Sequence, residues 1–130
     1  VHLGQEDLPC DLARRLLGPE RLLGVSVSTP EEARQAERAG ADYLGVSPIF
    51  VTPTKRDTPA ATGLDGLRAI RAVTALPLVA IGGLSAANAG EVVAAGADGI
   101  AVVSALMAAT DPREAARALR RAIAGHVQRP

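Results

Sequence analysis

The stretches GADYLGVS (residues 40–47) and GADGIAVVS (residues 96–104) are the strongest indication of the fold, because one pattern occurs twice in a short chain. In each, a glycine, an alanine and an aspartate lead into a run of apolar or small residues that ends in serine. A glycine after an alanine-rich helix fits the backbone that closes a helix C-terminus, and the apolar run fits a buried strand. The repeat therefore predicts two helix-to-strand units of the same construction.

Five short apolar runs are strand candidates, at residues 1–4, 22–28, 43–49, 78–82 and 99–104. They are continuous rather than alternating, which is typical of parallel strands covered on both faces. Helical patterns separate them, as expected when one crossover helix follows each parallel strand. No linker divides the chain, so we expect residues 1–130 to belong to one α/β domain.

Several of these helices have recognisable starts. TPEE (residues 29–32) and DPRE (residues 111–114) each supply an N-cap, a proline in the first turn and a glutamate at the third position. Ser85 is a candidate cap for a further helix that begins near Ala86. The chain therefore alternates strands with helices along most of its length.

The strand ends favour a barrel over an open sheet. No G-x-G-x-x-G turn follows the first strand, as a Rossmann-type sheet would require. Polar or small residues instead gather at the C-terminal strand ends, where barrel enzymes place their chemistry. They are Gln5, Glu6, Asp7, Ser26, Ser28, Ser47, Gly82, Gly83 and Ser104. We expect a TIM (β/α)8 barrel, of which this chain supplies about strands 4 to 8 and lacks the N-terminal strands. A missing N-terminal segment or self-association would then cover the free edges.

Composition excludes several classes of function. The 14 basic and 14 acidic residues give a net charge of +0, so no basic surface indicates nucleic acid. No apolar run approaches the length of a membrane span. Cys10 is the single cysteine, which fits a reducing compartment, so we expect a cytoplasmic protein.

Two strand ends form a candidate phosphate site. Gly82 and Gly83 end one apolar run, and Val103 and Ser104 end the next. Glycines let backbone N–H groups approach an anion, helix N-termini add partial positive charge, and barrels commonly bind phosphate between their last two loops. The alternative is that the glycines form only a tight turn and that Ser104 is a cap.

The loop after residue 47 is a second candidate, because Thr52, Pro53, Thr54 and Lys55 combine two hydroxyls, a stiff proline and a cation suited to phosphate oxygens. A solvated loop is the alternative.

Asp7 is a candidate Mg²⁺ ligand, because this ion takes one or two carboxylates together with waters and substrate phosphates. Alternatively, Asp7 opens the next helix near Leu8. His2 and His126 have no ligand partner at metal-binding spacing, and we interpret both as structural or solvated.

Five strings along the chain resemble the thiamine-phosphate synthases, a family of TIM-barrel enzymes. In order they are VHLGQEDLP, LLGVSVST, GADYLGVSPIFVTPTK, VAIGGL and GADGIAVVSAL, and they cover nearly the whole chain. The resemblance implies that a hydroxymethylpyrimidine diphosphate loses pyrophosphate while the nitrogen of a thiazole phosphate attacks its methylene carbon, giving thiamine phosphate. The family's Gln-x-Arg-x-Lys string and Asn-Asp pair have no counterpart in this sequence.

The resemblance also implies residue roles. Lys55 would be catalytic, neutralising the departing pyrophosphate together with a Mg²⁺ cofactor held by Asp7. Ser26 and Lys55 would contact the pyrimidine diphosphate. The thiazole phosphate would be bound by Thr52, Pro53, Thr54, Gly83, Val103 and Ser104. The loop would then close over the phosphates.

Two other interpretations compete with the synthase. A thiazole tautomerase shares the barrel and the phosphate site, although it tends to carry a histidine where this chain has Ser47. A noncatalytic phosphate-binding or assembly fragment is the third interpretation, because the strings expected to supply the second Mg²⁺ ligand and further basic groups are absent from the sequence.

Overall fold

The computed structural model describes residues 1–51 and 60–125, and these form one parallel five-stranded sheet with helices. The strands are β1 (His2–Leu3), β2 (Gly24–Val27), β3 (Tyr43–Val46), β4 (Leu78–Ile81) and β5 (Gly99–Ala101). They lie in the order β1-β2-β3-β4-β5, and every neighbouring pair is parallel. The predicted α/β class and all five strand positions are therefore confirmed.

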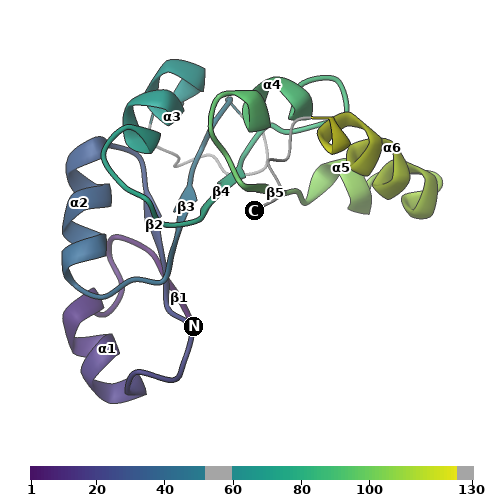
Figure 1. The fold of residues 1–130 in the computed structure, drawn as a ribbon. Helices are drawn as coiled ribbons and strands as arrows, with labels where there is room; N and C mark the ends of the chain where they lie inside the picture. The colour runs from purple at the N-terminus through teal and green to yellow at the C-terminus, as the bar shows by residue number, and fades with distance from the viewer. Residues whose placement is uncertain (52–59, 126–130) are drawn as a thin grey trace.

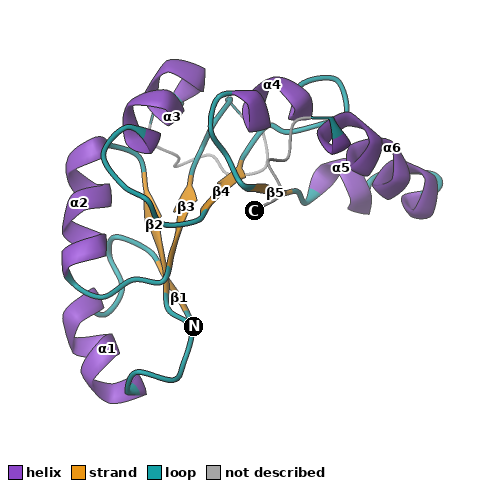
Figure 2. Ribbon diagram, viewed as in Figure 1, coloured by secondary structure: helices purple, strands orange, loops and turns teal. Residues whose placement is uncertain are grey.

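Helices follow the strands along the chain (Figure 2). They are α1 (Cys10–Leu17), α2 (Pro30–Arg38), α3 (Gly63–Arg71), α4 (Ala89–Ala94), α5 (Ser104–Met107) and α6 (Pro112–Ala124). Figure 1 shows that the sheet curves and that helices α1 to α4 lie along its outer side. Within the described residues, no helix covers the inner side of this curve.

Two of the predicted helix starts are confirmed in detail. The backbone N–H of Glu32 donates to Thr29 Oγ1 at 3.2 Å, and the Glu32 carboxylate accepts from the Thr29 backbone in a capping box. Asp111 Oδ1 accepts the Glu114 N–H at 3.0 Å at the start of α6.

The prediction for the helix after β4 was wrong. The Ser85 hydroxyl accepts the Ala87 N–H at 3.3 Å in a separate turn, and α4 begins only at Ala89. The side chain of Asn88 bonds back to the preceding loop and holds the chain in that turn before the helix starts.

The hydrophobic core lies between the sheet and the outer helices. Val25, Val27, Leu44, Val46 and Leu78 are buried strand residues that point to this side, and they pack in one cluster with the buried residues Ala33, Ala36, Leu67, Ile70 and Val92 of the helices. Residues that alternate with them point to the inner side.

The strands were predicted to be covered on both faces, and within the described residues helices cover the outer one. The inner side carries Gly24, Ser26, Tyr43 and Gly45 from two neighbouring strands, and Ser26 and Tyr43 are only half-buried. The next strand, β4, adds the half-buried apolar side chains of Val79 and Ile81 to this side.

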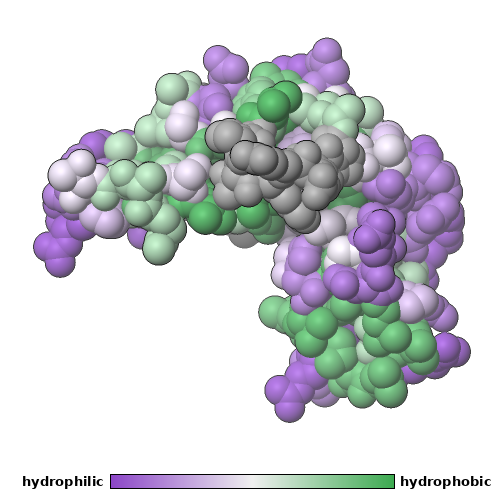
Figure 3. Space-filling model, turned by 180° about the vertical axis from the view of Figure 1, so that it is seen from behind, coloured by the Kyte–Doolittle hydropathy of each residue, from purple (hydrophilic) through white to green (hydrophobic). Residues whose placement is uncertain are grey.

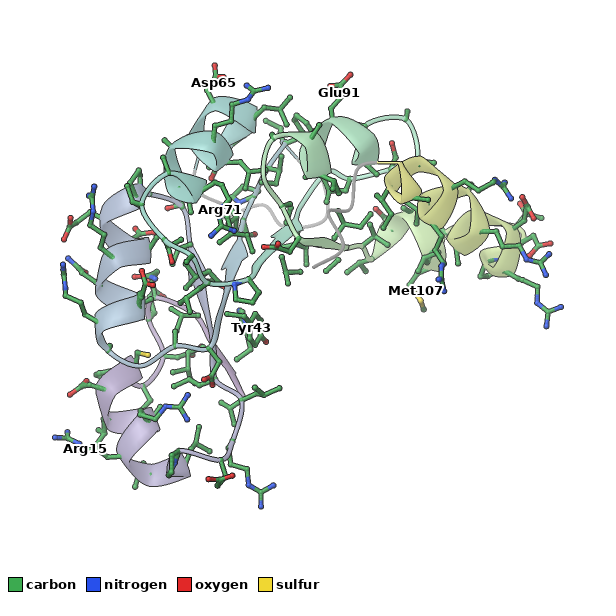
Figure 4. All side chains as sticks on the ribbon, in the orientation of Figure 1. Arg15, Tyr43, Asp65, Arg71, Glu91 and Met107 are labelled. Atoms are coloured by element: carbon green, nitrogen blue, oxygen red, sulfur yellow. The ribbon has the colours of Figure 1, made fainter. Side chains whose placement is uncertain are left out.

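The repeated GAD motif forms the same structure twice, at the N-terminal ends of two strands. Gly40 and Gly96 have φ of +93° and +117°, the left-handed backbone predicted from the repeat. A Cβ on Gly40 would lie 3.2 Å from Arg14 Cγ, and one on Gly96 would lie 2.8 Å from Arg71 Cγ. Glycine therefore lets an arginine from an earlier helix lie against each turn, and Figure 4 shows Arg71 directed from α3 toward the sheet.

Exposed apolar side chains gather at the β1 end of the sheet. Val1 is 62 %, Leu16 73 % and Leu22 71 % exposed, and Figure 3 shows hydrophobic surface at this end of the molecule. None of the described helices is long and apolar enough to cross a membrane.

Candidate functional site

All five strands are parallel, so the loops that follow them leave the same edge of the sheet. This edge carries Asp7 after β1, Gly83 after β4 and Ser104 after β5, and Ser26 lies within β2 near it. The expected arrangement of these residues along one rim is therefore what the structure has. The loop residues expected to bind phosphate lie outside the described residues; they are Thr52, Pro53, Thr54 and Lys55.

The turn of Gly82 and Gly83 needs glycine for two reasons. Their φ angles are +101° and +68°, in the region where glycine is favoured. A Cβ on Gly83 would also lie 2.7 Å from Phe50 Cβ, and one on Gly82 would lie 2.9 Å from Pro48 Cα. The turn therefore packs directly on the segment that leaves β3, and Phe50 N–H donates to Gly82 O at 3.1 Å.

Asn88 fixes the same turn from the other side. Its Nδ2 donates to the carbonyl of Gly83 at 3.0 Å, and its Oδ1 accepts the Ser85 N–H at 2.8 Å. No hydrogen bond joins the Gly83 N–H to another of the described residues. A backbone N–H of this kind at a glycine turn is a group that can bind an anion. Sequence analysis missed Asn88, although an amide just before a helix is a recognisable signal.

Val103 and Ser104 lie where β5 gives way to α5. Val103 is 55 % exposed and precedes the helix, and Ser104 is its first residue. The expectation that Ser104 ends the strand was wrong, because β5 stops at Ala101 and the chain turns at Val103 with φ of −115° and ψ of −74°. The first N–H groups of α5 have no acceptor within that helix. They are backbone donors on the same rim as Gly83.

Asp7 lies in the exposed loop after β1 and is bonded locally. Its Oδ2 accepts the Gly4 N–H at 2.6 Å, and its own N–H donates to Gly4 O at 3.3 Å. Helix α1 begins at Cys10 after Pro9 with no side-chain cap, so Asp7 does not open it. Among the described residues, no group of three or more His, Cys, Asp or Glu side chains could hold a metal.

A cavity of about 290 Å³ lies between the β1–α1 loop and helix α2. Its lining includes Asp7, Cys10 and Glu32, but not Ser26, Gly83 or Ser104. Burial raises the pKa of the Cys10 thiol, whose Sγ lies 3.7 Å from Ala39 O. A thiol that stays protonated is a poor nucleophile, which agrees with a packing role for Cys10.

Ser26 has polar partners on both its side chain and its backbone. Its hydroxyl lies 2.9 Å from His2 Nε2, and its carbonyl accepts Gln5 Nε2 at 2.6 Å. The other ring nitrogen of His2 lies 3.0 Å from the Tyr43 hydroxyl. Sequence analysis missed Gln5 as a neighbour of Ser26 and Tyr43 as a neighbour of His2, and its interpretation of His2 as structural or solvated did not include the contact with Ser26.

Known proteins resemble this chain over most of its length. A model of the thiamine monophosphate synthase family matches residues 1–106. The chain belongs to this family. A thiamine-phosphate synthase of Moorella thermoacetica is 57 % identical over 95 % of this chain, and one of Chloroflexus aurantiacus is 62 % identical over 92 %.

Solved structures agree with the family. The thiamine phosphate pyrophosphorylase of Pyrococcus furiosus superposes with a TM-score of 0.87 at 43 % identity and covers 98 % of this chain. The 3-hexulose-6-phosphate synthase of Salmonella typhimurium shares the fold, with a TM-score of 0.75 at 22 % identity. This chain spans 59 % of the Moorella synthase, 55 % of the Chloroflexus synthase and 60 % of the Pyrococcus protein.

Proposed function

We propose that the chain forms about strands 4 to 8 of a TIM-barrel thiamine-phosphate synthase. Five adjacent parallel strands in sequence order, with β1 and β5 as free edges, fit a continuous part of a barrel wall. The share of the relatives that the chain spans, 55 % to 60 %, fits five of eight strand–helix units. Three N-terminal units would close the barrel over the inner side, and a cytoplasmic location suits the lone thiol of Cys10.

The reaction joins two small molecules. The C–O bond between the pyrimidine methylene and the diphosphate breaks, and its electron pair leaves with pyrophosphate. The lone pair of the thiazole nitrogen forms the new C–N bond, giving thiamine phosphate. Negative charge develops on the leaving group, so fixed donors and cations near it stabilise the transition state.

The main support for this proposal is the N–H of Gly83. Asn88 holds the turn in place, and this N–H makes no hydrogen bond to another described residue. Together with the backbone of Val103 and Ser104, it would bind the phosphate of the thiazole substrate. Thr52, Pro53 and Thr54 would complete that pocket. Lys55 would bind the pyrimidine diphosphate and neutralise the leaving pyrophosphate, and Ser26 would contact the same substrate.

A Mg²⁺ ion suits the donors at the β1 end. Asp7 is exposed, and only its Oδ2 has a hydrogen-bond donor within the described residues. A single carboxylate is a sufficient protein contribution when phosphate oxygens and waters supply the other ligands. When bound, the ion would neutralise diphosphate charge, and Asp7 would hold it.

The test combines the chain with the missing strands. A chimaera would join the N-terminal segment of the Chloroflexus aurantiacus synthase, up to the start of its match, to Val1. We expect the 130-residue chain alone to form little thiamine phosphate and the chimaera to form it with one pyrophosphate per product. A folded chimaera that releases no pyrophosphate contradicts the synthase. Isomerisation of a thiazole phosphate without pyrophosphate release would indicate the tautomerase, and phosphate binding without either reaction would indicate a noncatalytic fragment.

A further inference from the structure

The inner side of the sheet carries three polar side chains from three adjacent strands. His2 of β1 pairs with Gly24 of β2, and Gly24 pairs with Tyr43 of β3, so these residues form one row across the sheet. Ser26 lies one row further toward the rim, paired with Gly45. Figure 4 shows Tyr43 on the inner side of the curve, away from α2.

Two strand glycines make room for the rings of this row. A Cβ on Gly24 would lie 2.1 Å from Tyr43 Cζ, so the tyrosine ring occupies the space above the middle strand. A Cβ on Gly45 would lie 3.0 Å from His2 Cε1. Glycine inside a strand weakens it, and its presence in two neighbouring strands marks a place where other groups must approach closely. The rings of His2 and Tyr43 consequently meet across β2, with centroids 5.5 Å apart.

A chain of hydrogen bonds follows from this packing. Tyr43 Oη lies 3.0 Å from His2 Nδ1, and His2 Nε2 lies 2.9 Å from Ser26 Oγ. A neutral imidazole has one N–H and one acceptor nitrogen, so the direction of one bond fixes the direction of the other. If Tyr43 donates to Nδ1, then Nε2–H donates to Ser26, and the serine proton is free to point elsewhere.

The chemistry of the two hydroxyls selects this direction. A phenol is more acidic than an aliphatic alcohol and is the better donor to an imidazole nitrogen. With Tyr43 as the donor to Nδ1, the Ser26 oxygen would accept from Nε2–H. Gln5 holds the backbone of Ser26 by donating to its carbonyl at 2.6 Å, which limits how far the serine can turn.

We propose that Tyr43 is a positioning residue that acts through His2 to direct the hydroxyl proton of Ser26 at a diphosphate oxygen on the inner side of the sheet. This inference rests on the proposed function, since it identifies the ligand of Ser26 as an anion. In this proposal Tyr43 and His2 orient the Ser26 hydroxyl. Gly24 and Gly45 are glycines because the two rings occupy the space above them. None of the described acidic side chains bonds to these three residues, so an anion meets no carboxylate within this hydrogen-bond chain.

The first readout is the ring of His2 itself. Nitrogen-15 spectra of the imidazole distinguish the Nδ1–H and Nε2–H tautomers, and His2→Gln identifies the signal. In the 130-residue chain at neutral pH we expect the Nε2–H form, with Nδ1–H rising in Tyr43→Phe. This variant keeps the ring above Gly24 and removes only the hydroxyl, so the fold is retained. An Nδ1–H tautomer in the unmodified chain, or an unchanged spectrum in Tyr43→Phe, overturns the proposal.

The second readout is binding of inorganic pyrophosphate, measured by titration of the same chain. Loss of one correctly directed hydrogen bond should weaken binding about three- to ten-fold in Tyr43→Phe. Ser26→Ala should weaken binding at least as much, and adding Tyr43→Phe to Ser26→Ala should change it less than about two-fold, because the tyrosine acts only through the serine. His2→Gln, which retains an amide donor, should bind better than His2→Phe.

Independent effects of Tyr43→Phe and Ser26→Ala that multiply in the double variant would refute the relay, as would pyrophosphate binding that leaves the His2 signal unmoved. These outcomes are separate from the chimaera assay. If Tyr43→Phe has the expected effects but the chimaera has no synthase activity, only the proposed function is rejected. If the chimaera is active but Tyr43→Phe has no effect, only this inference is rejected.

Discussion

Arg14 donates a hydrogen bond from Nη2 to Asp42 Oδ2 at 2.5 Å, and the same carboxylate oxygen accepts the backbone N–H of Leu23 at 2.7 Å. One aspartate thereby joins helix α1 to the N-terminal ends of β2 and β3. The second GAD motif repeats the contact, because Asp98 Oδ2 accepts from Arg71 Nη1 at 3.1 Å and from the Leu78 N–H at 2.8 Å. Both contacts lie at the N-terminal ends of the strands, opposite the rim. In barrel folds, residues at this end usually serve stability.

Removing this carboxylate should destabilise the fold. Asp42→Ala leaves the N–H of buried Leu23 without its acceptor and should lower the free energy of unfolding by about 1–3 kcal/mol in urea titrations. The control is Asp11→Ala, which breaks an exposed pair with Arg15 at 3.6 Å and should cost about 0.5 kcal/mol or less. Equal losses in the two variants would contradict a structural role for Asp42.

Stability should also depend on pH through this group. The Leu23 N–H, and then the Arg14 guanidinium, lower the pKa of Asp42. A carboxyl whose folded pKa is depressed contributes stability above its unfolded pKa of about 3.9 and loses that contribution as the pH falls through the folded value. The urea concentration at the unfolding midpoint should therefore decrease when the pH is lowered below about 4. Asp42→Asn should start lower and decline less steeply with acid, whereas curves that stay parallel would show that Asp42 contributes nothing to the acid loss.

The turn at Gly83 should tolerate no side chain. Gly83→Ala adds a Cβ 2.7 Å from Phe50 and strains a φ of +68°, so thiazole phosphate binding should weaken at least ten-fold by calorimetry. Gly18→Ala is the control, since Gly18 has a φ of +71° with no atom within 4 Å of a Cβ and lies at the end of α1. Both variants should lose stability, Gly83→Ala more because only it adds a clash, and binding should be lost only in Gly83→Ala. Retained affinity in Gly83→Ala would exclude the turn from the binding site.

The sequence predicted the elements whose signals are local. Buried strands, the caps at Thr29 and Asp111, and the glycines at Gly40 and Gly96 depend on residues a few positions apart, and each was confirmed. The two errors, at Ser85 and Ser104, concern where a helix begins, because several neighbouring residues offer competing caps there.

The site was less accessible to sequence analysis, for a physical reason. The hydroxyl of Ser26 contacts His2, 24 positions away, and His2 in turn contacts Tyr43, 41 positions away, so only the sheet register brings the three together. A usable signal was present but not used: Gly24 and Gly45 lie inside strands, and glycines there indicate a close approach without naming its partners.

Lys55 should be required for turnover. In the chimaera, Lys55→Ala should lower kcat at least ten-fold, because it removes a cation from the leaving pyrophosphate. Arg56→Ala removes the adjacent positive charge and serves as the control, with an expected change of less than about two-fold. An unchanged rate in Lys55→Ala would remove this residue from the chemistry, and equal losses in the two variants would indicate a general effect of charge.

The claim that the rim of this sheet binds phosphate is tested most directly by adding thiazole phosphate to the nitrogen-15-labelled chain and following every backbone amide. The account predicts saturable shifts at Gly83, Val103 and Ser104, with Asp42 and Asp98 at the opposite edge unaffected, and weaker binding in Ser104→Glu than in Ser104→Gln. Shifts centred on Asp42 and Asp98, or none that saturate, would contradict it.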